Sequence, residues 1–258
     1  MALKRVGRSE DVIRDFNAPA PGEVHVWRMA LAAEPSEIGR LFSILSEAER
    51  ARINRQPRDT AQRARIVCWG RTREILAGTI GCLPTEVSLR HGRTVKPTHD
   101  TARTDMRFSL SHSGDWALLA VTHGIDVGID IERIRRGADV HRLAERFFTS
   151  LETQQLLEHE ERARRDAFFR IWTCKEALIK ALGLGVPSAL GSFSVLRRAD
   201  GRLVAEPEDP DDERSVLGWK IVEPPAPAGY AAAIAVATEE PLVRVFDVPQ
   251  TAPRRVLR

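Results

Sequence analysis

The sequence predicts an α+β protein made of two similar halves. A strand, a short helix, a long helix and a group of strands follow one another twice along the chain. The segment SEAER before the first long helix also resembles SLETQ before the second. These two observations, together with apolar residues that alternate in the strands and recur with helical spacing in the helices, predict a duplicated unit with a junction near residues 124–126.

The first half is predicted to open with a strand and then turn helical. Ser46 and Glu49 form a capping-box pattern at the start of a short helix, and Pro57 interrupts that helix. Glycines and a proline end the long helix that follows. The elements expected besides the short helix are a strand at 23–29, a long helix from about 60 to 77, a strand around 87–89, a loop at 91–106, and strands at 107–110 and 116–123.

The second half is predicted to repeat this order. Thr149 or Ser150 caps a short helix through about Glu158, and Gly183 and Gly185 stop the long helix. The other expected elements are a strand at 126–133, the long helix at 162–182, and strands at 192–198, 203–205, 216–222 and 230–237. We therefore divide the chain into an N-terminal extension (1–20), two α+β halves (21–125 and 126–240) and a poorly ordered tail (241–258).

The composition indicates a globular protein without a large charge bias. Of the 258 residues, 43% are hydrophobic and 29% are charged. The longest apolar runs are too short to span a bilayer, and the N-terminus lacks the apolar core of a secretory signal. Three cysteines show no metal-binding spacing and leave one unpaired in any disulfide scheme, so a reducing cytoplasm is expected. The net charge of +3 permits an anionic ligand but is not typical of a nucleic-acid-binding surface.

The segment VGIDIER contains the first candidate site. Alternation along a strand places Asp130 and Glu132 on one face, about 7 Å apart, and Ile129 and Ile131 on the other. Two carboxylates on a rigid strand suit a hard cation such as Mg²⁺, which prefers oxygen ligands. The alternative is a half-buried edge strand with a solvated acidic face.

The segment FFRIWTCKEALIK contains the second candidate site. Glu176 and Lys180 are four residues apart and therefore share a helix face. Glu176 could be a third metal ligand or a base, and Lys180 could bind a phosphate. The alternative is an ordinary Glu–Lys helix pair.

The segment FSLSHSG contains the third candidate site. Ser111 and His112 lie in a predicted polar turn whose hydroxyl, imidazole and backbone N–H groups suit a phosphate. Adjacent strand residues project to opposite faces, which argues against a nucleophile–base pair.

The order and spacing of these segments resemble one family. Lys96-Pro97, FSLSHSG, VGIDIE and WTCKEALIK match the pattern K-P, F-N-x-S-H-S, G-[IV]-D-[IV]-E and W-x-x-K-E-[AS]-x-x-K of the Sfp-type 4′-phosphopantetheinyl transferases. The resemblance runs from about Leu45 to Ala237, and Ser109 replaces the asparagine of the family pattern. It implies two similar, pseudo-symmetric α+β halves with the cofactor cleft between them.

The resemblance also implies an activity. Enzymes of this family transfer the phosphopantetheine group of coenzyme A to a serine of an apo acyl or peptidyl carrier protein in fatty acid, polyketide or nonribosomal peptide synthesis, and they release adenosine 3′,5′-bisphosphate. A monomer that binds no nucleic acid or membrane is expected. The alternatives are a Mg²⁺-dependent phosphodiesterase and a non-catalytic module that binds carrier proteins.

Residue roles follow from the matching motifs. The implied metal ligands are Asp130, Glu132 and Glu176, and the implied catalytic residues are Glu176, Lys180 and Asp130. The implied coenzyme A contacts are Arg63, Lys96, Pro97, Ser111, His112, Lys175 and Lys180, with Arg65 as the alternative to Arg63 at the 3′-phosphate.

Overall fold

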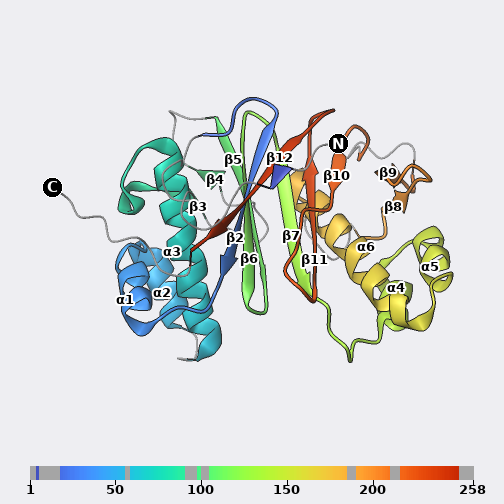
Figure 1. Cartoon of the computed structure of the whole chain (residues 1–258), viewed down its shortest axis with the longest axis horizontal. Helices are drawn as coiled ribbons and strands as arrows, with labels where there is room; N and C mark the ends of the chain where they lie inside the picture. Colours follow the sequence, from blue (N-terminus) through green and yellow to red (C-terminus); the bar gives the residue numbers. More distant parts are fainter. Residues whose placement is uncertain are drawn as a thin grey trace.

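Two five-stranded sheets pack against each other in the middle of the protein, and helices cover the outer face of each (Figure 1). The structure is a computed structural model that describes residues 4–5, 18–55, 59–90, 98–99, 105–184, 190–209 and 216–249. Helices of the first half lie on the left of Figure 1 and those of the second half on the right. The α+β class expected from the sequence is therefore confirmed.

The first sheet has the strand order β1-β12-β2-β6-β5, and its helices pack on one face. Strands β2, β6 and β5 pair antiparallel, whereas β12 runs parallel to β2. The strands are β1 (Lys4–Arg5), β2 (Glu23–Ala30), β5 (Met106–Ser113), β6 (Trp116–His123) and β12 (Leu242–Val248). The helices are α1 (Pro35–Ser43), α2 (Glu47–Asn54), α3 (Thr60–Ile80) and the 3₁₀ turn η1 (Pro84–Glu86); β3 (Leu89–Arg90) and β4 (Thr98–His99) form a separate ribbon.

The second sheet has the order β7-β11-β10-β9-β8 and is antiparallel throughout. Its strands are β7 (Val127–Arg133), β8 (Phe193–Arg197), β9 (Leu203–Pro207), β10 (Lys220–Val222) and β11 (Tyr230–Val236). Its helices are α4 (Val140–Phe147), α5 (Ser150–Leu157) and α6 (Glu161–Leu182). Helix α6 packs along β7 and β11 and is the counterpart of α3 in the first half.

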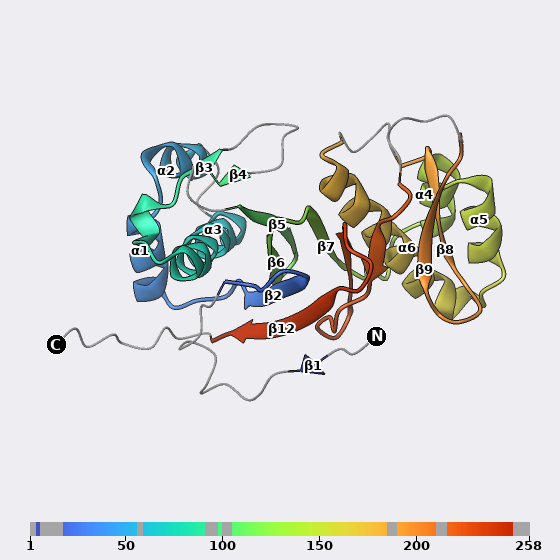
Figure 2. The same cartoon turned by 90° about the horizontal axis from the view of Figure 1, so that it is seen from above.

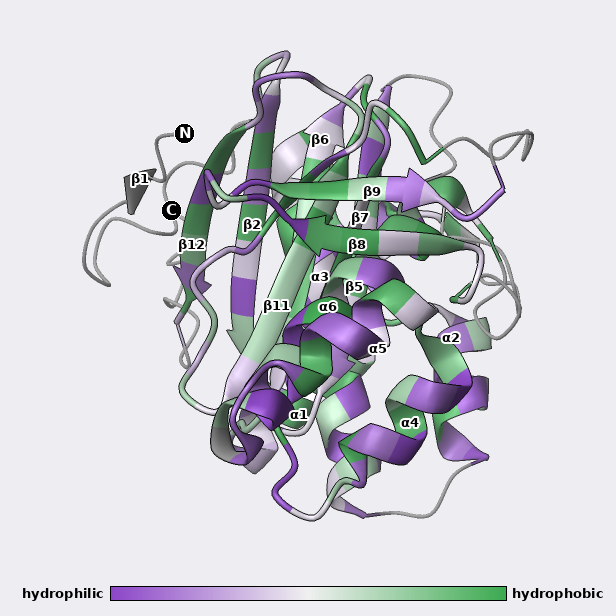
Figure 3. Cartoon of the chain, turned by 90° about the vertical axis from the view of Figure 1, so that its right-hand side faces the viewer, coloured by the Kyte–Doolittle hydropathy of each residue, from purple (hydrophilic) through white to green (hydrophobic). Residues whose placement is uncertain are grey.

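The apolar faces of the two sheets form a shared core. Val24 and Val26 of β2 pack in one cluster with Ile129 and Ile131 of β7, and all four are fully buried. Figure 3 shows the strands mainly in hydrophobic colours and the outer helices with hydrophilic stripes. Burial of Ile129 and Ile131 turns the intervening Asp130 to the other face of β7, as the alternation in the sequence predicted.

Most elements were predicted correctly, and six were missed. The structure adds β1, α1, η1, β4, α4 and β12 to the expected set, and β4 lies in the segment expected to be a loop. The tail prediction is wrong for residues 242–248, which form β12 instead of a loose segment. Val243 of β12 pairs with Val24 of β2, so the end of the described chain completes the sheet of the first half. No helix among the described residues is long and apolar enough to cross a membrane.

The two short helices predicted from the sequence, α2 and α5, begin with the expected capping boxes. The Ser46 side chain accepts from the Glu49 backbone N–H, and the Glu49 side chain accepts from the Ser46 N–H. Thr149 and Glu152 make the same two bonds at α5. Helices α3 and α6 both end at a glycine with a positive φ, 72° at Gly81 and 68° at Gly183.

Candidate functional site

The candidate site lies where edge strands of the two sheets meet. Strand β5 ends the first sheet and β7 ends the second, and they lie side by side without forming a backbone ladder (Figure 2). Asp130 and Glu132 of β7 both contact β5 through their side chains. The expectation that these two carboxylates share one face is therefore confirmed.

Gly128 allows α6 to approach β7 very closely. A Cβ atom at this position would lie 1.9 Å from the Ala177 carbonyl oxygen and 2.6 Å from the Ala181 backbone nitrogen. Both neighbours are backbone atoms, so they cannot rotate away as a flexible side chain would. The glycine in VGIDIE is thus required for the close packing that brings one face of α6 to β7.

Lys180 of α6 forms the centre of a polar cluster. Its Nζ lies 2.7 Å from Asp130 Oδ1, 2.9 Å from Ser111 Oγ and 3.3 Å from the Ile129 carbonyl oxygen. Ser111 Oγ in turn donates to Asp130 Oδ1 at 2.7 Å. Asp130 is 4% exposed, so this ion pair is more strongly coupled than one on the surface.

Glu132 is held by a different serine. Ser113 Oγ donates to Glu132 Oε2 at 2.7 Å and accepts from the Arg133 backbone N–H at 3.1 Å. Ser111, His112 and Ser113 are the last residues of β5, so the polar turn predicted there is strand instead. The turn itself begins at Gly114, whose φ is 55°.

The three carboxylates lie in an electrostatically unfavourable arrangement. Burial, reinforced by the Asp130 charge, raises the pKa of Glu176 to about 7. Burial also raises the pKa of Glu132, and the Asp130 charge adds to the effect, while the Ser113 hydrogen bond opposes it. A cation placed among these groups would remove this repulsion.

One oxygen of this cluster has no protein partner. Asp130 Oδ2 is buried and makes no hydrogen bond, although a buried carboxylate oxygen normally has one. Within the described residues, no three His, Cys, Asp or Glu side chains are gathered closely enough to hold a metal ion. The orphaned oxygen and the all-oxygen donor set nevertheless fit a hard divalent cation, because such an ion would supply the missing partner.

Basic groups lie next to this cluster on the side of the first half. Surrounding protein atoms partly desolvate the His112 ring and lower its pKa, although the residue is exposed, and the nearby charges of Arg65 and Lys180 lower it further. Arg65 is half-buried, whereas Arg63 is exposed on a different face of α3. The structure therefore brings Arg65, the alternative candidate, near His112, and it does not bring Arg63 there.

Lys175 is not part of this cluster. Its side chain is fully buried and donates to both Glu152 carboxylate oxygens, at 2.8 and 2.7 Å, and to the Phe193 carbonyl oxygen. All three ammonium protons are therefore used inside the second half. This placement opposes the expected coenzyme contact. Lys96 and Pro97 lie outside the described residues.

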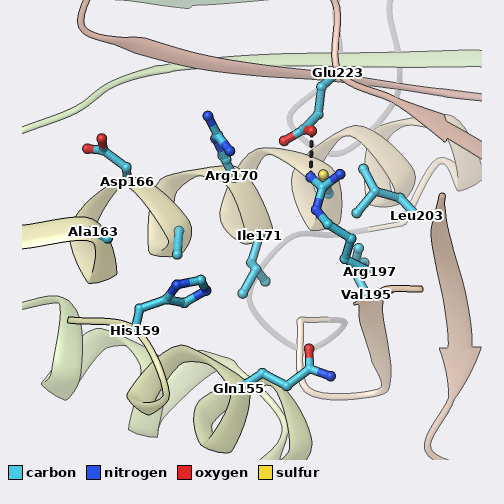
Figure 4. A pocket seen from close by; sticks show the side chains of 12 residues that line it. Gln155, His159, Ala163, Asp166, Arg170, Ile171, Val195, Arg197, Leu203 and Glu223 are labelled. Carbon is cyan, nitrogen blue, oxygen red and sulfur yellow. Dashed lines mark hydrogen bonds and ion pairs between the residues drawn. The ribbon is translucent and has the colours of Figure 1, made fainter. Parts of the chain in front are cut away.

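A separate hollow of about 330 Å³ lies beside α5, α6 and β8 (Figure 4). Arg197 and Glu223 pair across it at 2.5 Å, and Arg170 and Cys174 line it from α6. With about 100° per helical residue, this face of α6 lies opposite the one that carries Glu176 and Lys180. The hollow is therefore distinct from the candidate site.

Sequence reasoning missed two residues that shape the site. Gly128 was treated only as part of a motif, although a glycine in a buried strand often marks a close backbone approach. Ser113 was noted only within the polar turn. The alternation of Ser109, Ser111 and Ser113 was a usable signal, because residues two apart in a strand share a face.

The chain is similar to known phosphopantetheinyl transferases. The sequence model of the 4′-phosphopantetheinyl transferase superfamily matches residues 126–235. The 4′-phosphopantetheinyl transferase HetI of Nostoc sp. is 33% identical over 217 residues, which cover 83% of this chain and 88% of that protein. The 4′-phosphopantetheinyl transferase Sfp of Bacillus subtilis is 36% identical over 105 residues, or 41% of this chain and 46% of that protein.

Solved structures of smaller synthases also match in part. The holo-[acyl-carrier-protein] synthase of Thermotoga maritima aligns with a TM-score of 0.35 and 23% identity over 43% of this chain and 61% of that chain.

Proposed function

This chain belongs to the 4′-phosphopantetheinyl transferase superfamily, and we propose that it transfers the phosphopantetheine group of coenzyme A to a carrier-protein serine at the site between β5, β7 and α6. The observation that carries this proposal is the bonding of Lys180 to Asp130 and Ser111 beside the buried Glu176. The cluster combines a phosphate-binding cation with carboxylates that can hold a metal ion and accept a proton.

Asp130, Glu132 and Glu176 would hold Mg²⁺. The metal would supply neutralisation of the charge on the pyrophosphate of coenzyme A. Two features support this assignment: the partnerless Asp130 Oδ2 and the raised pKa values of Glu132 and Glu176.

Glu176 is the proposed general base. The carrier serine hydroxyl attacks the β-phosphorus of coenzyme A, and its proton goes to the Glu176 carboxylate. The bond from this phosphorus to the bridging pyrophosphate oxygen breaks, and adenosine 3′,5′-bisphosphate leaves. Burial raises the pKa of Glu176 to about 7 without a metal, so this environment favours proton uptake by the carboxylate at neutral pH, although a bound cation would lower the value.

Basic residues stabilise the phosphates of coenzyme A. Lys180 offsets charge that develops on the transferred phosphoryl group. His112 and Arg65 are the proposed contacts of the nucleotide phosphates, because the charges of Arg65 and Lys180 both act on His112. Lys96 and Pro97 keep their proposed place at the adenine side from sequence alone.

The proposed partners are apo acyl or peptidyl carrier proteins, and the proposed setting is the cytoplasm. All three cysteines are free, which suits a reducing compartment. Both sides of the site come from one chain, which supports a monomer as the active form.

Mass spectrometry of an apo-carrier protein tests the function. The carrier is incubated with the enzyme, coenzyme A and Mg²⁺, and its intact mass should rise by one phosphopantetheine group. The Asp130→Asn variant and a chelated reaction serve as controls and should give no product. Hydrolysis of coenzyme A without a carrier would support a phosphodiesterase, and an unmodified carrier bound independently of Mg²⁺ would support a binding module.

A further inference from the structure

Three serines on one face of β5 form a hydroxyl seam against β7. Ser109 Oγ accepts from the Ile129 N–H at 3.1 Å, Ser111 Oγ donates to Asp130 Oδ1, and Ser113 Oγ accepts from the Arg133 N–H. We use "hydroxyl seam" for these three serines. They join two edge strands that belong to different sheets and share no backbone ladder.

The seam replaces part of the missing ladder. An edge strand exposes unpaired N–H groups, and each buried one needs an acceptor. Ser109 and Ser113 are four residues apart, and so are their donors, Ile129 and Arg133. The seam therefore fixes the register of β7 against β5. It also fixes the position along β5 of the two carboxylates, Asp130 and Glu132, that lie between these two bonds.

Ser113 has its proton directed at one carboxylate. A hydroxyl has one proton and two acceptor sites. Since Ser113 Oγ accepts from the Arg133 N–H, its own proton is free to point at Glu132 Oε2, 2.7 Å away. Among the described residues, the cation that pairs with Glu132 is Arg135, which lies farther away at 3.8 Å and has a side chain that is 69% exposed.

We propose that Ser113 is a positioning residue that fixes the Glu132 carboxylate for Mg²⁺, an inference that rests on the proposed function. Asp130 is already anchored by Lys180 and Ser111, whereas Glu132 depends on Ser113 for its short contact. Groups that orient a metal ligand from the second layer typically change metal affinity by about 10- to 100-fold when removed. Ser113→Ala should therefore weaken metal binding by about that factor.

Ser109→Ala is the matched control. Ser109 lies on the same strand and face, is buried, and accepts from a backbone N–H of β7, but it contacts no carboxylate. Its loss leaves the buried Ile129 N–H without an acceptor and should lower the melting temperature. Metal affinity should stay near that of the wild type, because the Ser111 and Ser113 bonds still hold β7 at the two carboxylates.

Metal binding is measured by calorimetry with Mn²⁺ and coenzyme A, and the Mg²⁺ concentration that gives half-maximal transfer is measured separately. Ser113→Ala should raise both constants by about 10- to 100-fold, with kcat at saturating Mg²⁺ nearly unchanged. Ser113→Thr keeps the hydroxyl and should restore both.

Three outcomes would overturn this role. They are an unchanged Mn²⁺ affinity in Ser113→Ala, an equal loss in Ser109→Ala, and no Mn²⁺ binding by the wild-type enzyme. The proposed function fails separately if the wild-type enzyme binds Mn²⁺ but leaves the apo-carrier unmodified.

Discussion

Lys175 and Glu152 form a fully buried ion pair that has a counterpart in the other half of the protein. In the first half, Arg73 Nε lies 2.8 Å from Glu49 Oε2, and both side chains are 3% exposed. Each glutamate caps the short helix and each cation lies on the following long helix. Both cations also donate to carbonyl groups farther along the chain, Arg73 to Pro84 and Lys175 to Phe193. The two halves therefore share an equivalent buried ion pair between the short helix and the long helix.

Breaking the Lys175 pair should destabilise the protein strongly. Lys175→Met leaves the buried Glu152 charge without its partner, and such a loss costs about 3–5 kcal/mol. Denaturant unfolding measures this cost. The double variant Lys175→Met/Glu152→Gln should recover part of it, because no unpaired charge is left buried. The recovery should be incomplete, because the Thr149 and Val195 N–H groups bond to different Glu152 oxygens and the amide has one oxygen.

Catalysis should respond differently. At a temperature where Lys175→Met is folded, its KM for coenzyme A should match that of the wild type, since the ammonium faces the interior of the second half. A KM that rises tenfold at full folding would return Lys175 to the coenzyme site.

The sequence predicted that Asp130 and Glu132 share one strand face, but it did not predict which cations lie beside them. Asp130 and Glu132 follow directly from strand alternation, which holds wherever one face is buried. Lys175 was assigned by its place beside Glu176, but neighbours in a helix point about 100° apart. Arg63 and Arg65 also differ by about 200°, and only tertiary packing decides which one faces His112.

Two of the missed elements, β12 and α4, have a common cause. Strand β12 pairs with β2, more than 200 residues away in the sequence, and local patterns do not reveal a distant partner. Helix α4 is short, with a strong amphipathic stripe set among charged residues, and is stabilised mainly by packing on α5 and α6. Both elements form because they pack against another element, which the local sequence does not reveal.

Gly128→Ala should separate α6 from β7. The added methyl would overlap the Ala177 carbonyl oxygen at 1.9 Å, so the helix must shift and carry Glu176 and Lys180 with it. We expect a loss of at least about 1–3 kcal/mol of stability and a transfer rate reduced more than about tenfold. Gly137→Ala is the control, since a Cβ there meets no atom within 4 Å. Normal rates in both variants would contradict the packing argument.

Arg65 should bind the 3′-phosphate of coenzyme A. Arg65→Met removes a charged hydrogen-bond donor, which is worth about 1.5–3 kcal/mol, so KM for coenzyme A should rise by about 10- to 100-fold with little change in kcat. Dephospho-coenzyme A lacks that phosphate and should be insensitive to the change. Arg63→Met provides the control and should behave as wild type; the reverse pattern would favour Arg63.

His25 should make stability depend on pH. The side chain is 6% exposed, and burial lowers its pKa, with Arg244 adding to the effect and Glu23 opposing it. Because the folded pKa lies below the unfolded value of about 6.5, the unfolded chain binds more protons in this range. Stability from neutral His25 is therefore complete above pH of about 6.5 and is lost as pH falls.

The variant His25→Gln isolates this contribution. Unfolding free energies measured between pH 7.5 and 5 should fall less steeply in the variant than in the wild type. Identical slopes would mean that His25 keeps its ordinary pKa in the folded state.

Glu176 and Lys180 should separate catalysis from folding. Glu176→Gln keeps the side-chain size but removes the carboxylate that holds the metal or accepts the proton, so the rate should fall by about 100-fold or more. Its melting temperature should not decrease, because the variant also removes charge repulsion with Asp130. Lys180→Met should lose a similar factor in rate, since charge on the transferred phosphoryl group is no longer offset.

The two variants should differ in stability. Lys180→Met leaves the buried Asp130 without its cation 2.7 Å away, so its melting temperature without Mg²⁺ should fall below that of Glu176→Gln. Added Mg²⁺ and coenzyme A should narrow this difference, because the metal replaces the lost positive charge beside Asp130. Single-turnover transfer to an apo-carrier, measured beside thermal melts, tests both statements. Wild-type rates in both variants would make this pair an ordinary helix contact and leave the cluster around Asp130 without a catalytic role.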